Sequence, residues 1–242
     1  MTDDDLFMAV AGLLTGMMGA GFGGGVGVVA GPVLALMIPA KQALGVILPL
    51  TLAADVITVR YYWGHWEPKL VRALLPGCLI GIGIGAVLLD LIPEDMFRRL
   101  LGGMACVYAL FQVVGSRLTD RLQTSSRTGG LVVGIMAGLV STLLHSGGVV
   151  MMLYLAPLGL AGRRFVATAF LVGVALNLVK IGPYIVLGVI DQDSLAISVR
   201  MLPALAVGAL LGILLNHKLP KVWFNRMILA IVLTVGVKLL MS

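Results

Sequence analysis

The amino-acid sequence predicts an all-α polytopic membrane protein made of two inverted repeats, each a glycine-broken re-entrant hairpin plus about three transmembrane helices. Three observations lead to this fold class. Of the 242 residues, 60% are hydrophobic and 12% are charged, whereas a soluble domain is about 25% charged. Apolar runs of about 20 residues, enough to cross a hydrocarbon layer of about 30 Å, recur along the chain. The chain also resembles itself at a nearly fixed offset.

Eight apolar segments are expected, at residues 6–38, 43–60, 70–92, 97–116, 129–161, 165–190, 195–216 and 222–241. Six have the length of one crossing. The first and the fifth are too long for one straight helix and are interrupted by glycine, at Gly19-Ala-Gly-Phe-Gly-Gly-Gly25 and at His145-Ser-Gly-Gly148. Each of these two predicts a pair of half-helices joined at a glycine break.

An internal repeat organises the segments. Sliding the chain by 127 residues places Gly81 on Gly208 and Pro93 on Pro220, and an offset of 126 places Leu13 on Leu139. The repeat predicts an N-terminal half at 1–120 and a C-terminal half at 121–242 of one integral membrane domain.

The net charge of +6 resolves into a lopsided pattern that predicts orientation. If both interrupted segments begin and end on one face, eleven Lys and Arg lie on one side, five on the other, and Lys180 lies within the membrane. Basic residues favour the cytoplasmic side, so the basic loops 60–72, 117–128, 163–164 and 217–226 are expected in the cytoplasm of a multi-pass inner (plasma) membrane protein. Each half then has an odd number of crossings and is inverted. The first segment alone stays open between a hairpin and one crossing, because the acidic N-terminus carries no Lys or Arg.

The residue content excludes several classes of protein. Cys78 and Cys106 lie in separate apolar segments, so neither a CxxC metal site nor a disulfide framework is expected. The basic surplus lies in loops, which argues against a nucleic-acid partner. The acidic start lacks the basic region of a signal peptide, so the N-terminal segment is expected to be retained. No nucleophile motif or acid pair is present, and we expect no enzyme activity, metal or cofactor.

The two glycine breaks predict a binding site inside the membrane. Irregular backbone at that depth is tolerated only when protein buries it or when it lines a watery cavity. New half-helices begin at Gly23, Gly24 and Gly25 and at Gly147 and Gly148, where unpaired N–H groups and the helix dipole favour an anion. The alternative is that the glycines only permit close helix crossing.

Lys180 is the basic residue that the loops do not explain, about 15 Å from the end of its segment at 1.5 Å per residue. Asn177 and Tyr184 share its helical face and are expected to bind the substrate with it, and Gly182-Pro183 is expected to break the helix beside it. An ammonium at this depth predicts contact with an anionic substrate. The alternative is a structural ion pair with Asp55.

Further polar residues are candidates for supporting roles. Asp55 and Arg60 are expected to serve coupling or gating, with Asp55 either buried or reaching the interface. Ser141, His145 and Ser146, together with Thr142, line the second break and either bind the anion or cap the half-helix. A protease pair of His145 and Ser146 is disfavoured, because adjacent side chains rarely face each other.

Small residues form ridges at Gly77-xxx-Gly81-xxx-Gly85 and Ala204-xxx-Gly208-xxx-Gly212. Such ridges let helices touch closely. They predict packing between the two halves or, alternatively, a homodimer interface.

These motifs resemble the TauE/SafE sulfite exporter family, also called the four-toluene-sulfonate uptake permeases, over nearly the whole chain. The resemblance is carried by the cluster Gly19–Gly25, by Ser146-Gly-Gly148, and by Arg163-Arg-Phe-Val-Ala-Thr168 leading to Asn177-Leu-Val-Lys180. In the second copy the family usually has a fuller Gly-x-Gly-Gly-Gly, and this departure bears on substrate choice. The resemblance implies an exporter or permease for sulfite, organosulfonates or related sulfur anions, driven by an ion gradient. A carrier for carboxylates, or for a metal or other cation, is the alternative.

Overall fold

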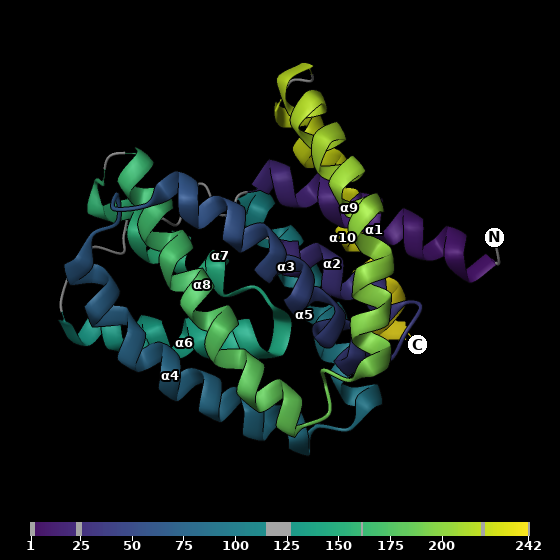
Figure 1. Ribbon diagram of the computed structural model, residues 1–242, viewed down its shortest axis with the longest axis horizontal. Helices are drawn as coiled ribbons and strands as arrows, with labels where there is room; N and C mark the ends of the chain where they lie inside the picture. Colours follow the sequence, from purple (N-terminus) through teal and green to yellow (C-terminus); the bar gives the residue numbers. More distant parts are fainter. Residues whose placement is uncertain (1–2, 23–25, 115–126, 161, 219–220, 242) are drawn as a thin grey trace. The chain divides into compact units, whose positions relative to one another are not determined.

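A computed structural model of the chain describes residues 3–22, 26–114, 127–160, 162–218 and 221–241 (Figure 1). The regular elements within these ranges are all helices, as predicted. In chain order they are α1 (Asp3–Phe22), α2 (Val26–Ala35), α3 (Ala40–Tyr62), α4 (Pro68–Leu91), α5 (Glu94–Val114), α6 (Arg127–Leu144), α7 (Gly147–Leu155), the short 3₁₀ helix η3 (Ala156–Leu158), α8 (Gly162–Val186), α9 (Gln192–Lys218) and α10 (Lys221–Met241). Every expected apolar segment contains a helix, and the two long segments contain two α-helices each.

Three helices of the described residues are long and apolar enough to cross a membrane, by length and composition. They are α4, α8 and the part of α9 that covers Gln192–Leu211. With 24 residues, α4 is about 36 Å long at 1.5 Å per residue, which exceeds a hydrocarbon layer of about 30 Å. Shorter apolar helical stretches occur in α1, α6, α7 with η3, and α10.

The chain forms two compact units that differ from the two halves of the sequence. Unit 1 contains Met1–Ile47, Pro93–Val113 and Val189–Ser242, and unit 2 contains Leu48–Ile92 and Val114–Gly188. Each unit therefore combines segments from both halves. Each unit mixes the two halves because a helix of one half packs against a helix of the other, α4 against α6 and α1 against α9.

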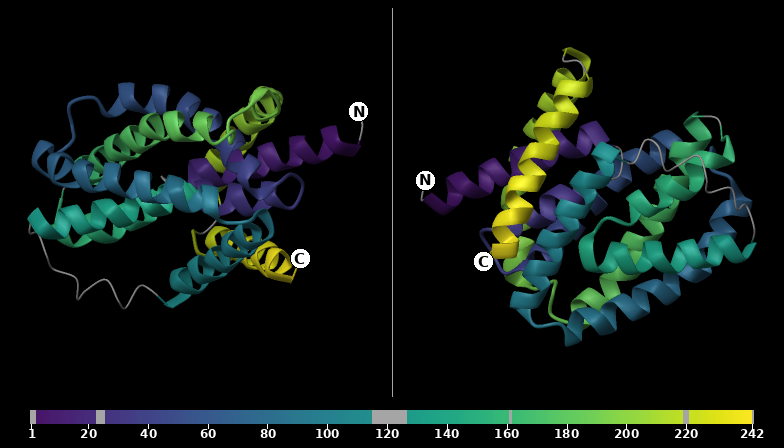
Figure 2. Two further views of the ribbon diagram at one scale, coloured as in Figure 1. Left: turned by 90° about the horizontal axis from the view of Figure 1, so that it is seen from below. Right: turned by 180° about the vertical axis from the view of Figure 1, so that it is seen from behind.

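In unit 2, α4 packs along α6, and the two helices lie side by side in Figures 1 and 2. Glycines on both helices make this contact close. A Cβ added at Gly77 or Gly81 would collide with the carbonyl oxygens of Leu131 or Ile135, and one added at Gly138 would collide with the carbonyl oxygen of Cys78. The backbones therefore meet directly, which only glycine allows at these positions.

Unit 1 repeats this contact with the roles of the halves exchanged. Here α1 packs along α9, and a Cβ at Gly16 would collide with the carbonyl oxygen of Leu205, while one at Gly208 would collide with that of Leu13. Each pair joins one helix from residues 1–120 to one from 121–242. The prediction that small-residue ridges pack the two halves together is confirmed.

The core of unit 2 holds the polar residues described below. Its buried apolar side chains come from α4, α6, α7 and α8, and include Leu74, Ile82, Met151, Val172 and Leu176. Because these residues fix α8 against α6 and α7, the polar face of α8 has a defined position opposite the break between α6 and α7.

Candidate functional site

The expected break in the fifth apolar segment is present. Helix α6 ends at Leu144 and α7 begins at Gly147. His145 between them has a φ of 52°, in the left-handed region that non-glycine residues rarely adopt. A Cβ at Gly147 would lie 2.7 Å from both the Ala137 oxygen and the Ser141 Cβ, so glycine is required where α7 starts against α6.

The first turn of α7 presents free backbone donors. Within the described part of the chain, the N–H groups of Gly147 and Gly148 have no hydrogen-bond acceptor, whereas the next N–H, of Val149, bonds to the Ser146 oxygen at 3.1 Å. Such donors, together with the positive end of the helix dipole, favour an anion.

The hypothesis that hydroxyls cap this half-helix is wrong. Ser146 makes no side-chain cap bond, and its hydroxyl donates to the Leu144 oxygen at 2.7 Å. The physical reason is its backbone, with φ of −125° and ψ of 22° instead of the extended conformation of a capping residue. Thr142 likewise donates backward, to the Gly138 oxygen at 2.9 Å.

Lys180 lies on the face of α8 opposite the break and is 0% exposed. Its ammonium donates to the Ser141 carbonyl oxygen at 3.2 Å and to His145 Nδ1 at 3.2 Å. Both acceptors are neutral. Ser141 also packs against Gly147, so the ammonium and the first turn of α7 share one neighbour.

His145 has both ring nitrogens engaged. Nδ1 accepts from Lys180, so Nε2 carries the proton and donates to Thr51 Oγ1 at 3.1 Å. The Thr51 hydroxyl in turn donates to the Leu48 oxygen at 2.9 Å. The imidazole is therefore placed to orient Lys180. Sequence reasoning missed Thr51; its signal is a hydroxyl within an apolar segment, one helical turn before Asp55.

Asp55 is buried rather than reaching the interface, with 9% of its surface exposed. Its carboxylate accepts a hydrogen bond of 2.8 Å from Asn177 Nδ2. In the described residues, therefore, the Asp55 carboxylate bonds to Asn177 and the Lys180 ammonium to Ser141 and His145. The alternative of a direct ion pair between the two is not formed, although their opposite charges attract each other at longer range. Arg60 is exposed at the end of α3 and makes none of these contacts.

Tyr184 lies one turn beyond Lys180 and is 0% exposed. Its hydroxyl donates to the Thr142 carbonyl oxygen at 2.6 Å, and its ring centroid lies 5.9 Å from Lys180 Nζ. Sequence analysis expected Gly182-Pro183 to break the helix before this point, but α8 continues through Pro183 to Val186. Pro183 has no backbone N–H and so removes one hydrogen bond of the helix. The helix tolerates this loss because Pro183 lies three residues before its end.

The arrangement combines a buried ammonium and open N–H donors, which can bind an anion, with the nearby carboxylate of Asp55. Lys180 and the N–H groups of α7 contribute positive charge, and no group of three or more His, Cys, Asp or Glu among the described residues could hold a metal ion. The predicted first break, Gly23, Gly24 and Gly25, lies outside the described residues. The structure thus brings together Ser141, His145, Gly147, Lys180 and Tyr184, with Asp55 and Asn177 adjoining them.

A family model described as sulfite exporter TauE/SafE matches residues 8–239, nearly the whole chain. Neither the curated proteins nor the solved structures gave a match.

Proposed function

The chain belongs to the sulfite exporter TauE/SafE family, and we propose that it is a secondary transporter that carries sulfite or an organosulfonate across the plasma membrane. The family is one of membrane transporters, and the apolar helices agree with a multi-pass membrane protein. The choice of substrate, the site and the transport cycle are our proposals.

One observation carries the proposal: the Lys180 ammonium is fully buried with neutral hydrogen-bond acceptors. Burying a charge that makes no direct ion pair costs several kcal/mol even after relaxation, and the longer-range attraction of the buried Asp55 carboxylate offsets only part of this cost. Here the first turn of α7 adds positive charge beside the ammonium. An anion that binds between them would offset both, because opposite charges attract strongly at low dielectric.

In the proposed complex, sulfur-bound oxygens accept hydrogen bonds from Lys180 and from the N–H groups of Gly147 and Gly148. His145 and Tyr184 hold the two sides of the site in place. Asn177 orients the Asp55 carboxylate, which we assign to coupling or gating together with Arg60. Neutralising the anion at mid-membrane lowers the cost of moving it through the apolar layer.

Alternating access would follow from two inverted halves, 1–120 and 121–242. Support comes from the equivalent helix pairs. A Cβ at Gly81 would meet Leu139 of α6, and one at Gly208 would meet Leu13 of α1, and the repeat relates Gly81 to Gly208 and Leu139 to Leu13. By the repeat, we propose that Gly23, Gly24 and Gly25 bind an anion in the first half as Gly147 and Gly148 do in the second. We further propose that the basic loops are cytoplasmic, and a homodimer remains a prediction.

A carboxylate carrier is the nearest alternative, because the same N–H groups can donate hydrogen bonds to carboxylate oxygens. A metal or other cation carrier fits less well, because a buried ammonium repels cations. Binding of sulfite and taurine measured against divalent metals on purified protein separates these classes.

The test is transport in proteoliposomes offered sulfite, taurine, sulfoacetate and simple carboxylates at two pH values. We expect uptake of a sulfur anion, and its loss in Lys180→Gln. The matched control is Lys238→Gln, which removes an exposed lysine near the end of α10. Transport that is equal in Lys180→Gln and the wild type would refute the role of Lys180, and uptake of carboxylates alone would refute the substrate class.

A further inference from the structure

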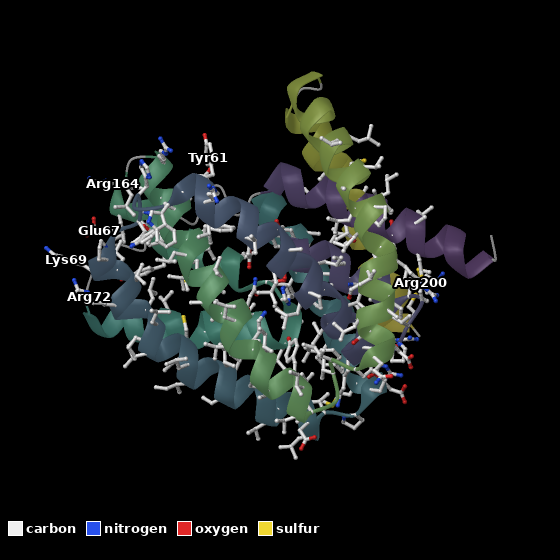
Figure 3. All side chains as sticks on the ribbon, viewed as in Figure 1. Tyr61, Glu67, Lys69, Arg72, Arg164 and Arg200 are labelled. Carbon is white, nitrogen blue, oxygen red and sulfur yellow. The ribbon has the colours of Figure 1, made fainter. Side chains whose placement is uncertain are left out.

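Five exposed basic side chains gather at one end of unit 2, although they come from three separate stretches of sequence. We call them, with the exposed aromatic residues Tyr61 and Trp63, the basic collar; the basic members are Arg60, Lys69, Arg72, Arg163 and Arg164. Figure 3 shows Tyr61, Lys69, Arg72 and Arg164 at the same end, with their polar tips directed outward. Apart from Arg60, which we assign to coupling or gating, none of them belongs to the proposed transport site.

Specific contacts bring these stretches together. Arg163 donates to the Tyr61 carbonyl oxygen at 3.4 Å, and its guanidinium carbon lies 5.4 Å from the centroid of the Tyr61 ring. The Glu67 N–H donates to Thr168 Oγ1 at 2.9 Å. The first contact joins the start of α8 to the end of α3, and the second joins the start of α4 to α8. The collar is therefore one surface.

The collar combines positive charge with large exposed aromatic rings. Tyr61 is 66% exposed and Trp63 is 68% exposed. Tyrosine and tryptophan with this exposure, at the ends of membrane helices, are typical of the boundary between acyl chains and headgroups. The collar is thus suited to a partner that is both apolar and charged.

The helix dipoles add to the positive charge. Both α4 and α8 begin here, and neither has an acidic residue in its first turn. Basic residues at a helix N-terminus are disfavoured by the dipole. Glu67, half-buried before α4, is the acidic residue of this surface within the described stretches 60–72 and 162–168. The positive electrostatic potential of the collar therefore favours an anion from outside the chain.

We propose that the basic collar binds the headgroup phosphate of an anionic phospholipid of the phosphatidylglycerol or cardiolipin class. Clusters of four to eight basic residues beside membrane helices attract such lipids. The arginines provide paired donors for phosphate oxygens, and Tyr61 and Trp63 contact the glycerol region. Farther along α4, Leu79 and Ile80 are 52% and 49% exposed, which provides an apolar surface for the acyl chains. A free phosphate ion would not use this apolar surface.

Trp63 provides the reporter for the test. In a variant with Trp66→Phe and Trp223→Phe, Trp63 is the remaining tryptophan of the three in the chain. The protein is reconstituted in vesicles that contain either brominated phosphatidylglycerol or brominated phosphatidylcholine, and quenching of Trp63 gives the relative binding of the two lipids. No transport substrate is needed, so the result is independent of the proposed function.

We expect the anionic lipid to be preferred by about fivefold or more, the ratio that corresponds to about 1 kcal/mol for one basic residue near the surface. High salt should weaken the preference in the unmodified collar, without any charge substitution. Arg163→Gln with Arg164→Gln should lower the ratio by at least about twofold, because two of the five basic side chains of the collar are removed. Arg200→Gln, which removes an exposed arginine on α9 outside the collar, should leave it unchanged.

Three outcomes would overturn the proposal. Equal quenching by the two lipids would mean that the collar faces another partner, such as an acidic protein. An unchanged preference in the double variant or at high salt would place the lipid elsewhere. Displacement of the brominated lipid by inorganic phosphate would make the collar a site for free anions.

Discussion

Replacing Tyr184 by phenylalanine separates two roles for this residue. Sequence analysis placed Tyr184 among the substrate-binding residues, whereas in the structure its hydroxyl donates to the Thr142 carbonyl at 2.6 Å. Thr142 lies in the last turn of α6, where the carbonyl oxygens have no N–H donor within the helix. Tyr184 therefore completes the end of α6, and Tyr184→Phe should destabilise the protein.

The magnitude follows from burial. Tyr184 is 0% exposed and Thr142 is 0% exposed, so water cannot replace the missing donor without rearrangement. A buried polar group that loses its partner costs about 1–3 kcal/mol. Taking about 2 kcal/mol, and about 2–4 °C per kcal/mol for a chain of this size, Tm should fall by about 4–8 °C.

The assay is thermal unfolding of purified protein in one detergent, followed by anion transport below Tm. Tyr154→Phe is the matched control, because Tyr154 is half-buried on α7 and its hydroxyl has no partner among the described residues. The control should shift Tm by about 1–2 °C at most, since substitutions outside such networks cost about 0.5 kcal/mol or less. An unchanged Tm in Tyr184→Phe combined with a raised KM would refute this reasoning and assign the hydroxyl to the substrate.

Three further predictions concern backbone contacts and a loop. Gly81→Ala should destabilise the protein by about 1–3 kcal/mol, because the new methyl group would meet the backbone of α6. Gly83→Ala, on the same helix with open space around it, should instead stabilise the protein by up to about 1 kcal/mol. Chemical or thermal unfolding of both variants checks this. Gly147→Ala should lower Tm and transport together, and Gly173→Ala, which has nothing within 4 Å, should lower neither. Hydrogen bonds from Ser194, mainly from its backbone N–H and then from its side chain, lower the pKa of Asp191 in the loop before α9. The ionised carboxylate therefore adds a small amount to the free energy of unfolding. This stabilisation is present above the pKa of Asp191 in the unfolded chain and is lost as the pH falls through its pKa in the folded protein. The Tm difference between wild type and Asp191→Asn should therefore shrink on acidification, and a difference independent of pH would contradict it.

The sequence was sufficient for the helices and for one break, since length, hydropathy and glycine clusters act locally. Lys180 could be singled out because a cation within an apolar segment is costly wherever it points. Its partners could not be predicted. Whether Lys180 meets Asp55 or His145 depends on how α3 and α6 are rotated against α8, and neither rotation is encoded in a local pattern. The same rotation places the Thr51 hydroxyl 3.1 Å from His145 Nε2. In the sequence alone, apart from its place one helical turn before Asp55, nothing distinguishes Thr51 from other hydroxyl residues of the apolar segments.

The exchange of helices between halves shows a second limit of the sequence. The repeat predicts that residues 1–120 and 121–242 resemble each other, but similarity does not specify which surfaces meet. Gly81 needs a partner backbone at close range, and α6 supplies it from the other half. Compact units that mix both halves follow from this pairing. Small-residue ridges therefore predict close contact more reliably than they predict its partner.

The break between α6 and α7 acts on Lys180 and on an anion in opposite ways. The last carbonyls of α6, those of Ser141 and Thr142, accept hydrogen bonds from Lys180 and Tyr184, so the negative end of α6 partly compensates the buried ammonium. The first N–H groups of α7 carry partial positive charge, opposite to that of the α6 carbonyls, and remain open to a ligand. One interruption thus allows the cation to be buried without direct contact to a carboxylate and leaves N–H donors for an anion. A continuous helix through residues 144–147 would remove both effects, because its carbonyls and N–H groups would bond to each other.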